Sequence, residues 1–160
     1  MLSIQEKIFQ LDGLKGQVQK WQSEGETVVF TNGCFDLIHR GHLDYLSKAR
    51  RLGDRLIIGL NSDYSVQRLK GPERPVNDEL SRAELLASLY FVDAVVLFEE
   101  DTPANLIEGL APNILVKGGD YVVADIVGYD TVINSGGRVL TIPFLDGFSS
   151  TNLIQKIKNL

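Results

Sequence analysis

Short apolar runs alternate with amphipathic stretches along most of this chain. Five of the runs are rich in Val, Ile, Leu and Phe, which is typical of strands buried on both faces of a parallel sheet. The predicted strands are Val28–Thr31, Arg55–Leu60, Ala94–Phe98, Asn113–Val116 and Arg138–Ile142. Between them, apolar residues recur every three or four positions, as in helices that pack on a sheet. The predicted helices are Leu43–Leu52, Ser81–Tyr90, Thr102–Leu110, Ala124–Asn134 and a last one from Ser149 to the end of the chain.

Strands that alternate with helices require crossover connections, and therefore a parallel sheet with helices on both faces. We expect an α/β protein with a Rossmann-like, doubly wound sheet of five parallel strands. The first residues lie outside this alternation. Their apolar positions, spaced by three or four, predict a helical extension over residues 1–24, ahead of one α/β domain over residues 25–160.

Composition removes several classes of function. Of the 160 residues, 44% are hydrophobic and 23% charged, and the net charge of −5 argues against general nucleic-acid binding. Cys34 is the single cysteine, so no disulfide can form within the chain. No apolar run has the character of a signal peptide or the length of a membrane span. We therefore expect a cytoplasmic protein without nucleic-acid or membrane partners.

Four polar or glycine-rich segments follow the ends of predicted strands. They are Asn32–His42, Asn61–Asp63, Lys117–Asp120 and Phe144–Thr151. The carboxyl ends of parallel strands meet at one edge of a sheet, where such sheets bind ligands. We therefore expect the four segments to converge on one cleft.

Both histidines lie in the tetrapeptide His39-Arg40-Gly41-His42, where the first predicted strand leads into a helix. Free N–H groups and the helix dipole attract phosphate at such a position, and residues three apart share one helix face. The two imidazoles are therefore predicted to reach the same anion. Two other interpretations stay open: a solvated polar first turn, and a zinc site with Cys34, His39 and His42 as ligands.

Further cations and polar turns surround the predicted cleft. They are Arg68, Lys70, Arg74, Lys117 beside Gly118-Gly119, and the helix start Ser149-Ser150-Thr151. Each also has a simpler interpretation, as a surface charge, a tight turn or an N-cap. A glycine and two prolines between Lys70 and Asn77 predict a loop that is mobile in the free protein and ordered by substrates.

The sequence lacks both G-x-G-x-x-G after the first strand and G-x-x-x-x-G-K-[ST], which argues against a dinucleotide enzyme and a P-loop ATPase. The cations suit a reaction whose nucleophile is already ionised, such as a sugar phosphate attacking a nucleoside triphosphate. That chemistry needs alignment and charge neutralisation more than a general base.

Several motifs make the chain resemble a known family. Gly33-Cys34-Phe35-Asp36 with His39-Arg40-Gly41-His42, followed far downstream by Ser149-Ser150-Thr151, is similar to the HxGH nucleotidyltransferases of the cytidylyltransferase-like superfamily. A second set resembles the adenylyltransferase half of bacterial ADP-heptose synthases. Its segments are Arg68–Gly71, Arg74–Asn77, Phe98–Pro103 and Val116–Tyr121. The resemblance covers residues 24–160.

The resemblance implies that ATP reacts with D-glycero-β-D-manno-heptose 1-phosphate to give pyrophosphate and ADP-heptose, a precursor of the lipopolysaccharide core. Mg²⁺ would arrive with ATP, no side chain is assigned to a metal, and we expect a homodimer. The implied catalytic residues are His39, His42 and Lys70. The implied nucleotide-binding residues are Asn32, Gly33, Cys34, Phe35, Gly41, Lys117, Gly118, Gly119, Asp120, Gly147, Ser149, Ser150 and Thr151. The implied sugar-phosphate-binding residues are Asp36, Arg68, Arg74 and Arg82.

Two positions depart from relatives. Ile154 stands where many carry an arginine, and Phe144–Gly147 stands where cytidylyltransferases have Arg-Thr-Glu-Gly. A cytidylyltransferase acting on glycerol 3-phosphate or another polyol phosphate stays an alternative, as does a nucleotide-binding regulatory module without turnover. The sugar-kinase half of the synthases is absent from this sequence, and Met1 with the N-terminal helix favours a stand-alone enzyme over an excised domain.

Overall fold

Six parallel strands form one sheet in the structure, a computed structural model that describes residues 2–160. Their order across the sheet is β1-β4-β3-β2-β5-β6. The strands are β1 (Ile8–Phe9), β2 (Val28–Gly33), β3 (Arg55–Asn61), β4 (Ala94–Phe98), β5 (Ile114–Gly118) and β6 (Arg138–Ile142). β2 lies inside the sheet, so the segment that follows it is flanked by the ends of β3 and β5.

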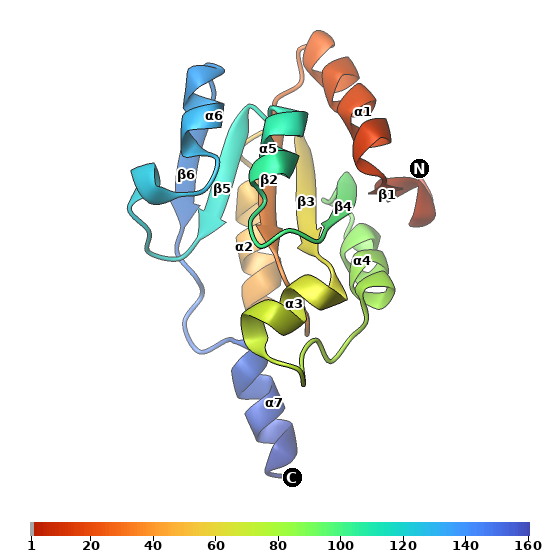
Figure 1. The fold of residues 1–160 in the computed structure, drawn as a ribbon, viewed down its shortest axis with the longest axis vertical. Helices are drawn as coiled ribbons and strands as arrows, with labels where there is room; N and C mark the ends of the chain where they lie inside the picture. The colour runs from red at the N-terminus through yellow and green to blue at the C-terminus, as the bar shows by residue number, and fades with distance from the viewer. Residues whose placement is uncertain (1) are drawn as a thin grey trace.

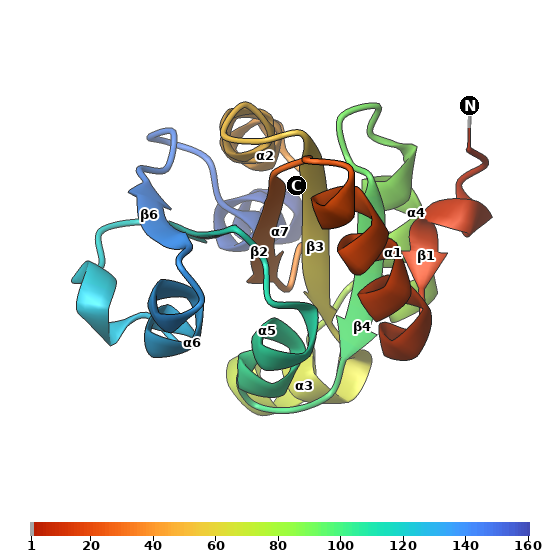
Figure 2. The ribbon, with the colours of Figure 1, turned by 90° about the horizontal axis from the view of Figure 1, so that it is seen from above.

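Helices cover both faces of the sheet (Figure 1). They are α1 (Leu11–Ser23), α2 (Arg40–Arg50), α3 (Asp63–Lys70), α4 (Glu79–Ser88), α5 (Ala104–Leu110), α6 (Tyr129–Asn134) and α7 (Ser150–Lys158), with short 3-10 helices η1 (Gln5–Lys7) and η2 (Val123–Asp125). Figure 2 shows α2 and α4 on one face and α1, α5 and α6 on the other. α7 projects beyond the carboxyl ends of the strands (Figure 1). Among residues 2–160, every helix is too short or too polar to span a bilayer.

Alternate side chains of each inner strand enter two separate cores. Val28 and Phe30 of β2 pack with Leu14 of α1 and Ile107 of α5 in one core. Val29, between them, packs on the opposite face in the core that α2 and α4 close. Burial on both faces explains why the inner strands are almost uniformly apolar.

The predicted fold class is confirmed, and all five predicted strands are present. The count of five was wrong by one, because β1 pairs Ile8 and Phe9 with Val95 and Val96 of β4. A strand of two residues has no periodicity that a sequence pattern could reveal. β1 and α1 share the sheet and core of the rest of the chain, so these two elements of the predicted extension are integrated into the fold. The division at residues 24 and 25 stays a prediction.

Several helix boundaries differ from prediction: α2 begins at Arg40 and not at Leu43, and α5 begins at Ala104 and not at Thr102. Two further differences have a clear local cause. α4 begins at Glu79 because Asp78 is its N-cap and accepts a hydrogen bond from the Ser81 N–H at 2.9 Å. Ser81, predicted to open this helix, therefore lies inside its first turn. The predicted helix Ala124–Asn134 is split into η2 and α6 by Gly128, whose φ of +89° is left-handed.

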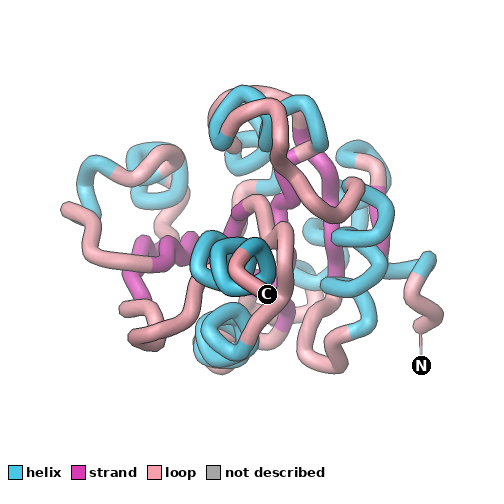
Figure 3. Tube along the Cα trace, turned by 90° about the horizontal axis from the view of Figure 1, so that it is seen from below, coloured by secondary structure: helices cyan, strands magenta, loops and turns pink. Residues whose placement is uncertain are grey.

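The chain changes direction across the sheet between β2 and β5. From β2 it proceeds to β3 and β4 on one side, and then returns past β2 to β5 and β6 on the other. Ligands bind at such a switch point, outside the carboxyl ends of the strands. Figure 3 looks onto that edge, with α7 in front of the middle of the sheet.

Leu14→Ala tests whether α1 belongs to the cooperative core. Leu14 is fully buried, so we expect the truncation to lower the free energy of unfolding by about 2–5 kcal/mol. Urea unfolding measures this change, with Lys20→Ala on the exposed side of α1 as the control. A Leu14→Ala protein as stable as the control would show that α1 packs loosely on the sheet.

Candidate active site

The segment after β2 turns sharply at Gly33 and Phe35. Phe35 has a φ of +44°, a left-handed conformation that is costly for a bulky residue. A Cβ atom on Gly33 would lie 2.9 Å from the Phe35 ring, so the turn requires glycine there. The Phe35 ring is buried and meets the His42 imidazole edge-on, with 5.2 Å between centroids. Phe35 therefore supports one side of His42.

The two histidines cap the helix that they begin. His39 is the N-cap of α2, and its Nδ1 accepts a hydrogen bond from the Gly41 N–H at 3.1 Å. His42 Nδ1 accepts from the His39 N–H at 3.4 Å, and the two rings stack with centroids 3.8 Å apart. A Cβ atom on Gly41 would lie 2.9 Å from His39 Cε1, so glycine leaves room for the stack. With Nδ1 accepting, each neutral ring carries its proton on Nε2 and can donate it to a ligand.

Both imidazoles are held neutral near pH 7. Burial lowers the pKa of His42 to about 4, and the charges of His39 and Lys70 add to this shift. Burial also lowers the pKa of His39. The pair therefore offers neutral N–H donors that can stabilise charge on phosphate oxygens without first taking up a proton.

The start of α7 lies beside the histidine pair. Ser149 caps α7 by accepting from the Asn152 N–H at 2.9 Å, and Ser150 Oγ donates to the Leu37 carbonyl at 3.0 Å. Between the two helix starts lies a cavity of about 240 Å³, here called the histidine cavity. It is lined by His39, Gly41, His42, Lys70, Phe144, Leu145, Phe148, Ser149, Ser150 and Thr151. Two helix N-termini at one cavity favour an anionic ligand.

A central cavity of about 200 Å³ adjoins the histidine cavity at the ends of β2 and β5. The residues that line both are His42, Lys70, Phe144 and Ser150. Tyr45 and Phe144 form an aromatic wall with centroids 6.0 Å apart. A Cβ atom on Gly118 would lie 2.5 Å from the Phe144 ring, so the ring packs directly on glycine backbone. Aromatic faces over bare backbone suit a planar base.

Lys70 and Lys117 place positive charge at the central cavity. Lys70 is the last residue of α3, and Lys117 points in from β5. Burial lowers the pKa of Lys117, and its Nζ lies 5.6 Å from the centroid of the Tyr121 ring. Within residues 2–160, neither ammonium group forms an ion pair. Both charges are therefore available to a phosphate.

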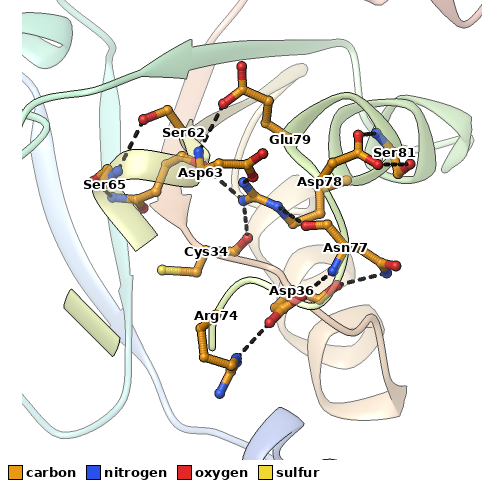
Figure 4. A network of polar contacts seen from close by, with 12 residues as sticks. Cys34, Asp36, Ser62, Asp63, Ser65, Arg74, Asn77, Asp78, Glu79 and Ser81 are labelled. Carbon is orange, nitrogen blue, oxygen red and sulfur yellow. Dashed lines mark hydrogen bonds and ion pairs between the residues drawn. The ribbon is translucent and has the colours of Figure 1, made fainter. Parts of the chain in front are cut away.

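Asp36 anchors the loop between α3 and α4 through hydrogen bonds and an ion pair. Its buried carboxylate accepts from the Val76 and Asn77 N–H groups, both at 2.9 Å, and pairs with Arg74 Nε at 2.7 Å (Figure 4). Burial on its own would raise the pKa of Asp36, but these three partners together hold it below its usual value. The second half of the loop is thus anchored to Asp36, because a buried carboxylate needs partners to replace water. The ordering of this loop by substrates stays a prediction.

Arg82 connects the backbone segments that lie beneath the candidate site. It is fully buried, and its guanidinium donates to the carbonyls of Cys34 at 2.7 Å, Asn61 at 2.8 Å and Asn77 at 3.0 Å. It also pairs with Asp63 Oδ1 at 2.8 Å. A direct contact with a sugar phosphate, implied by the resemblance, does not fit a side chain sealed in this way. Arg82 is a positioning residue.

Arg68 is also committed to protein partners. Its Nε pairs with Asp101 Oδ1 at 2.9 Å, and Nη2 donates to the Glu99 carbonyl. It lines neither the central nor the histidine cavity. The implied contact of Arg68 with the sugar phosphate stays a prediction.

The structure brings together most of the residues singled out from sequence. Those that line the two cavities are Asn32, Gly33, Cys34, Phe35, Asp36, His39, Gly41, His42, Lys70, Lys117, Gly118, Ser149, Ser150 and Thr151. Those that do not are Arg68, Arg74, Arg82, Gly119, Asp120 and Gly147. Gly119 and Gly147, with φ of +102° and +83°, shape the adjoining turns, and Asp120 is exposed.

Sequence reasoning did not place Tyr45 at the site. It lines the central cavity, but an aromatic residue within a helix normally indicates core. Phe144 and Phe148 also line the cavities, and they lie within the predicted segment Phe144–Thr151 without having been singled out as site residues. The zinc alternative also fails on geometry: among residues 2–160, no group of three His, Cys, Asp or Glu side chains could hold a metal ion.

Comparison with known proteins identifies the family. A family described as cytidylyltransferase-like matches residues 30–156. The chain belongs to this family. The resemblance found in the histidine motif is thereby confirmed at the level of the cytidylyltransferase-like superfamily.

Named relatives add detail to the cytidylyltransferase-like assignment. The chain is 56% identical over 151 residues to the bifunctional protein HldE of Geobacter metallireducens, covering 94% of the chain and 31% of the relative. It is 61% identical over 136 residues to HldE of Trichlorobacter lovleyi, covering 85% of the chain and 28% of the relative. The chain thus spans about a third of the length of these curated relatives.

Solved structures agree with the cytidylyltransferase-like fold. A lipopolysaccharide core biosynthesis protein from Thermoplasma volcanium matches with a TM-score of 0.60 and 28% identity, over 76% of this chain and 98% of that one. A pantothenate synthetase from Thermus thermophilus matches with a TM-score of 0.65 over 92% of this chain and 67% of that one. The second match, at 16% identity, shows the fold alone.

The depressed pKa of His42 makes stability depend on pH. Between about pH 6.5 and 4 the unfolded chain takes up a proton at His42 that the folded chain does not. The free energy of unfolding should therefore fall as the pH drops through this window. In His42→Asn, whose amide oxygen can replace Nδ1 in the cap, the fall should be smaller.

Urea unfolding at several pH values between 7 and 4.5 measures this difference. Leu43→Ala, a half-exposed neighbour on α2, is the control, since it keeps His42 and should keep the wild-type pH dependence. If the free energy of unfolding fell equally with pH in wild type and His42→Asn, the depressed pKa of His42 would be contradicted.

Proposed function

We propose that this chain transfers the adenylyl group of ATP to D-glycero-β-D-manno-heptose 1-phosphate, releasing pyrophosphate and forming ADP-heptose. The observation that carries the proposal is the pair of neutral histidine donors set between the N-termini of α2 and α7, with two lysines alongside. The HldE relatives and the lipopolysaccharide core biosynthesis protein support the choice of sugar phosphate over other acceptors.

In this proposal, the central cavity and the histidine cavity bind different parts of the nucleotide. The base occupies the central cavity against Phe144 and Gly118, and the triphosphate runs past His42 into the histidine cavity. There the N–H groups at the start of α7 receive its terminal phosphates. The α-phosphorus then lies near the histidine pair, where the two cavities meet.

The reaction is a displacement at that phosphorus. An oxygen of the sugar 1-phosphate forms a bond to the α-phosphorus, while the bond to the oxygen bridging the α- and β-phosphates breaks and its electrons leave with pyrophosphate. The attacking oxygen is already ionised near pH 7, so no general base is needed. The Nε2–H groups of His39 and His42 and the ammonium groups of Lys70 and Lys117 stabilise the charge that builds on the phosphate oxygens.

Mg²⁺ enters this proposal with ATP. Nucleotidyltransferases of this kind use a divalent metal with the nucleoside triphosphate, and Mg²⁺ supplies charge neutralisation on phosphate oxygens when bound. Asp36, the carboxylate that lines the central cavity, is occupied by Arg74, Val76 and Asn77. This donor set fits an ion held mainly by phosphates and water. A homodimer and a cytoplasmic location stay part of the proposal.

A substrate screen tests the assignment. Pyrophosphate release is measured for ATP and CTP, each with the heptose 1-phosphate and with glycerol 3-phosphate. We expect turnover with ATP and the heptose 1-phosphate, and little or none with CTP and glycerol 3-phosphate, because Phe144 offers no charged contact to a cytosine edge. Comparable kcat/KM for the CTP pair would replace the heptose assignment with the cytidylyltransferase one. No turnover with any pair would favour a regulatory module.

The histidine pair is tested by His39→Asn and His42→Asn. Asparagine caps helices well and its oxygen can stand in for Nδ1, so both variants should stay folded while losing the Nε2–H donor. We expect kcat to fall by about 10²–10³-fold, as when one preorganised donor is removed, with a smaller change in the KM for ATP. Pyrophosphate release and urea unfolding are measured on the same samples. Near-normal kcat in both stable variants would overturn the mechanism.

A further inference from the structure

A third cavity, of about 340 Å³, lies on the other face of the sheet from the histidine pair. Its wall includes Leu115 and Ile126, which belong to the core that α1 and α5 close. It is here called the α5-side cavity. The residues that it shares with the central cavity are Asn32, Gly33, Cys34, Lys117 and Tyr121. The end of β2 is therefore a ridge with one cavity on each side.

Polar side chains from three separate crossovers converge on the α5-side cavity. Asn61 lies at the end of β3, Asp101 and Thr102 lie between β4 and α5, and Asp125 lies in η2. In the described part of the chain, the side chains of Asn32, Thr102 and Asp125 form no hydrogen bond or ion pair with protein. Amide, hydroxyl and carboxylate groups without protein partners can all bond to the hydroxyl groups of a ligand.

The rest of the lining is apolar. Leu69, Pro103, Leu115 and Ile126 contribute hydrocarbon surface beside these polar groups. A sugar ring needs both kinds of surface, since its hydroxyls require hydrogen-bond partners and its C–H groups require apolar contact. Neither a fatty chain nor a phosphate alone would match this lining.

Charge favours one orientation of a phosphorylated sugar in this cavity. Asp125, whose carboxylate has no cation partner in the described part of the chain, lines only the α5-side cavity and would repel a phosphate group, whereas Lys117 lines both cavities and would attract it. The phosphate is therefore favoured at the shared edge, next to the site where the α-phosphorus of ATP was placed. Asp101 is kept in place by its 2.9 Å ion pair with Arg68.

We propose that the α5-side cavity is the acceptor subsite, in which Thr102, Asp125 and Asp101 bind the sugar hydroxyls while Lys117 holds the phosphate at the ridge. This inference rests on the proposed function, because it takes the acceptor to be a sugar 1-phosphate. It gives Arg68 the role of orienting Asp101 rather than binding phosphate.

Steady-state kinetics of Thr102→Val and Asp125→Ala test the subsite. Both side chains are exposed and bond to no other residue, so the variants should fold normally. Loss of one neutral hydrogen bond should raise the KM for the heptose 1-phosphate by about 3–10-fold, and loss of a charged one by about 10-fold or more. The KM for ATP should stay within about twofold of wild type, since neither residue lines the nucleotide cavities.

Asp130→Ala is the matched control. It removes an exposed carboxylate from α6, close in sequence to Asp125, that lines none of the three cavities. Calorimetric titration of each variant with the heptose 1-phosphate in the absence of ATP gives a second measurement independent of turnover. The affinity for the heptose 1-phosphate should fall more in Asp125→Ala than in Thr102→Val, and Asp130→Ala should bind it as wild type does.

The outcomes separate this inference from the proposed function. Wild-type turnover together with unchanged KM and affinity for the sugar phosphate in both variants would overturn the subsite and leave the function standing. A raised KM for ATP instead would assign the α5-side cavity to the nucleotide and also overturn it. Absence of turnover in the wild type with every sugar 1-phosphate would contradict the proposed function itself.

Discussion

The buried guanidinium of Arg82 is the constraint on which the site depends. Its four acceptors come from four places: the residue directly after β2, the end of β3, the start of α3 and the residue before the α4 cap. A charge with no access to water must have each of its donors directed at an acceptor, which leaves these segments little freedom to move. Arg82 therefore holds the loop that carries the histidines in a fixed position relative to α3, the helix that ends in Lys70.

In the proposed mechanism each imidazole of the histidine loop serves folding through one ring nitrogen and chemistry through the other. Nδ1 of each imidazole completes the cap of α2, and this fixes the Nε2–H of each neutral ring as the free donor. The cap also decides the charge of the pair, because it holds both rings against buried surface where a proton is unfavourable. Tautomer, orientation and protonation state thus follow from one local structure that forms when the helix forms.

The elements predicted well from sequence are those with a long, regular pattern. The inner strands are apolar throughout because both faces are buried, and the four polar segments meet because parallel strands end on one edge. β1 escaped prediction because two residues carry no period, and its pairing depends on an edge of β4 that sequence does not show. The start of α4 was misplaced because Ser81 and Glu84, three residues apart, have the residue types and spacing of a capping box. The N-cap in the structure is Asp78.

The sequence did not reveal that the arginines around the site pair with carboxylates while its lysines stay unpaired in the described part of the chain. Arg74, Arg82 and Arg68 pair with Asp36, Asp63 and Asp101, at N–O distances of 2.7, 2.8 and 2.9 Å. A planar guanidinium matches a carboxylate in shape, so it can neutralise one and still donate to carbonyls, whereas an ammonium cannot reproduce this pattern.

Under the proposed function, a chain of net charge −5 has to attract two anions, and the different roles of arginine and lysine make this possible. With three carboxylates around the cavities neutralised by arginine, the unpaired charges of Lys70 and Lys117 dominate the field where the phosphates meet. The acidic surface elsewhere is screened within a Debye length of about 10 Å, so the local excess of positive charge decides where a phosphate binds.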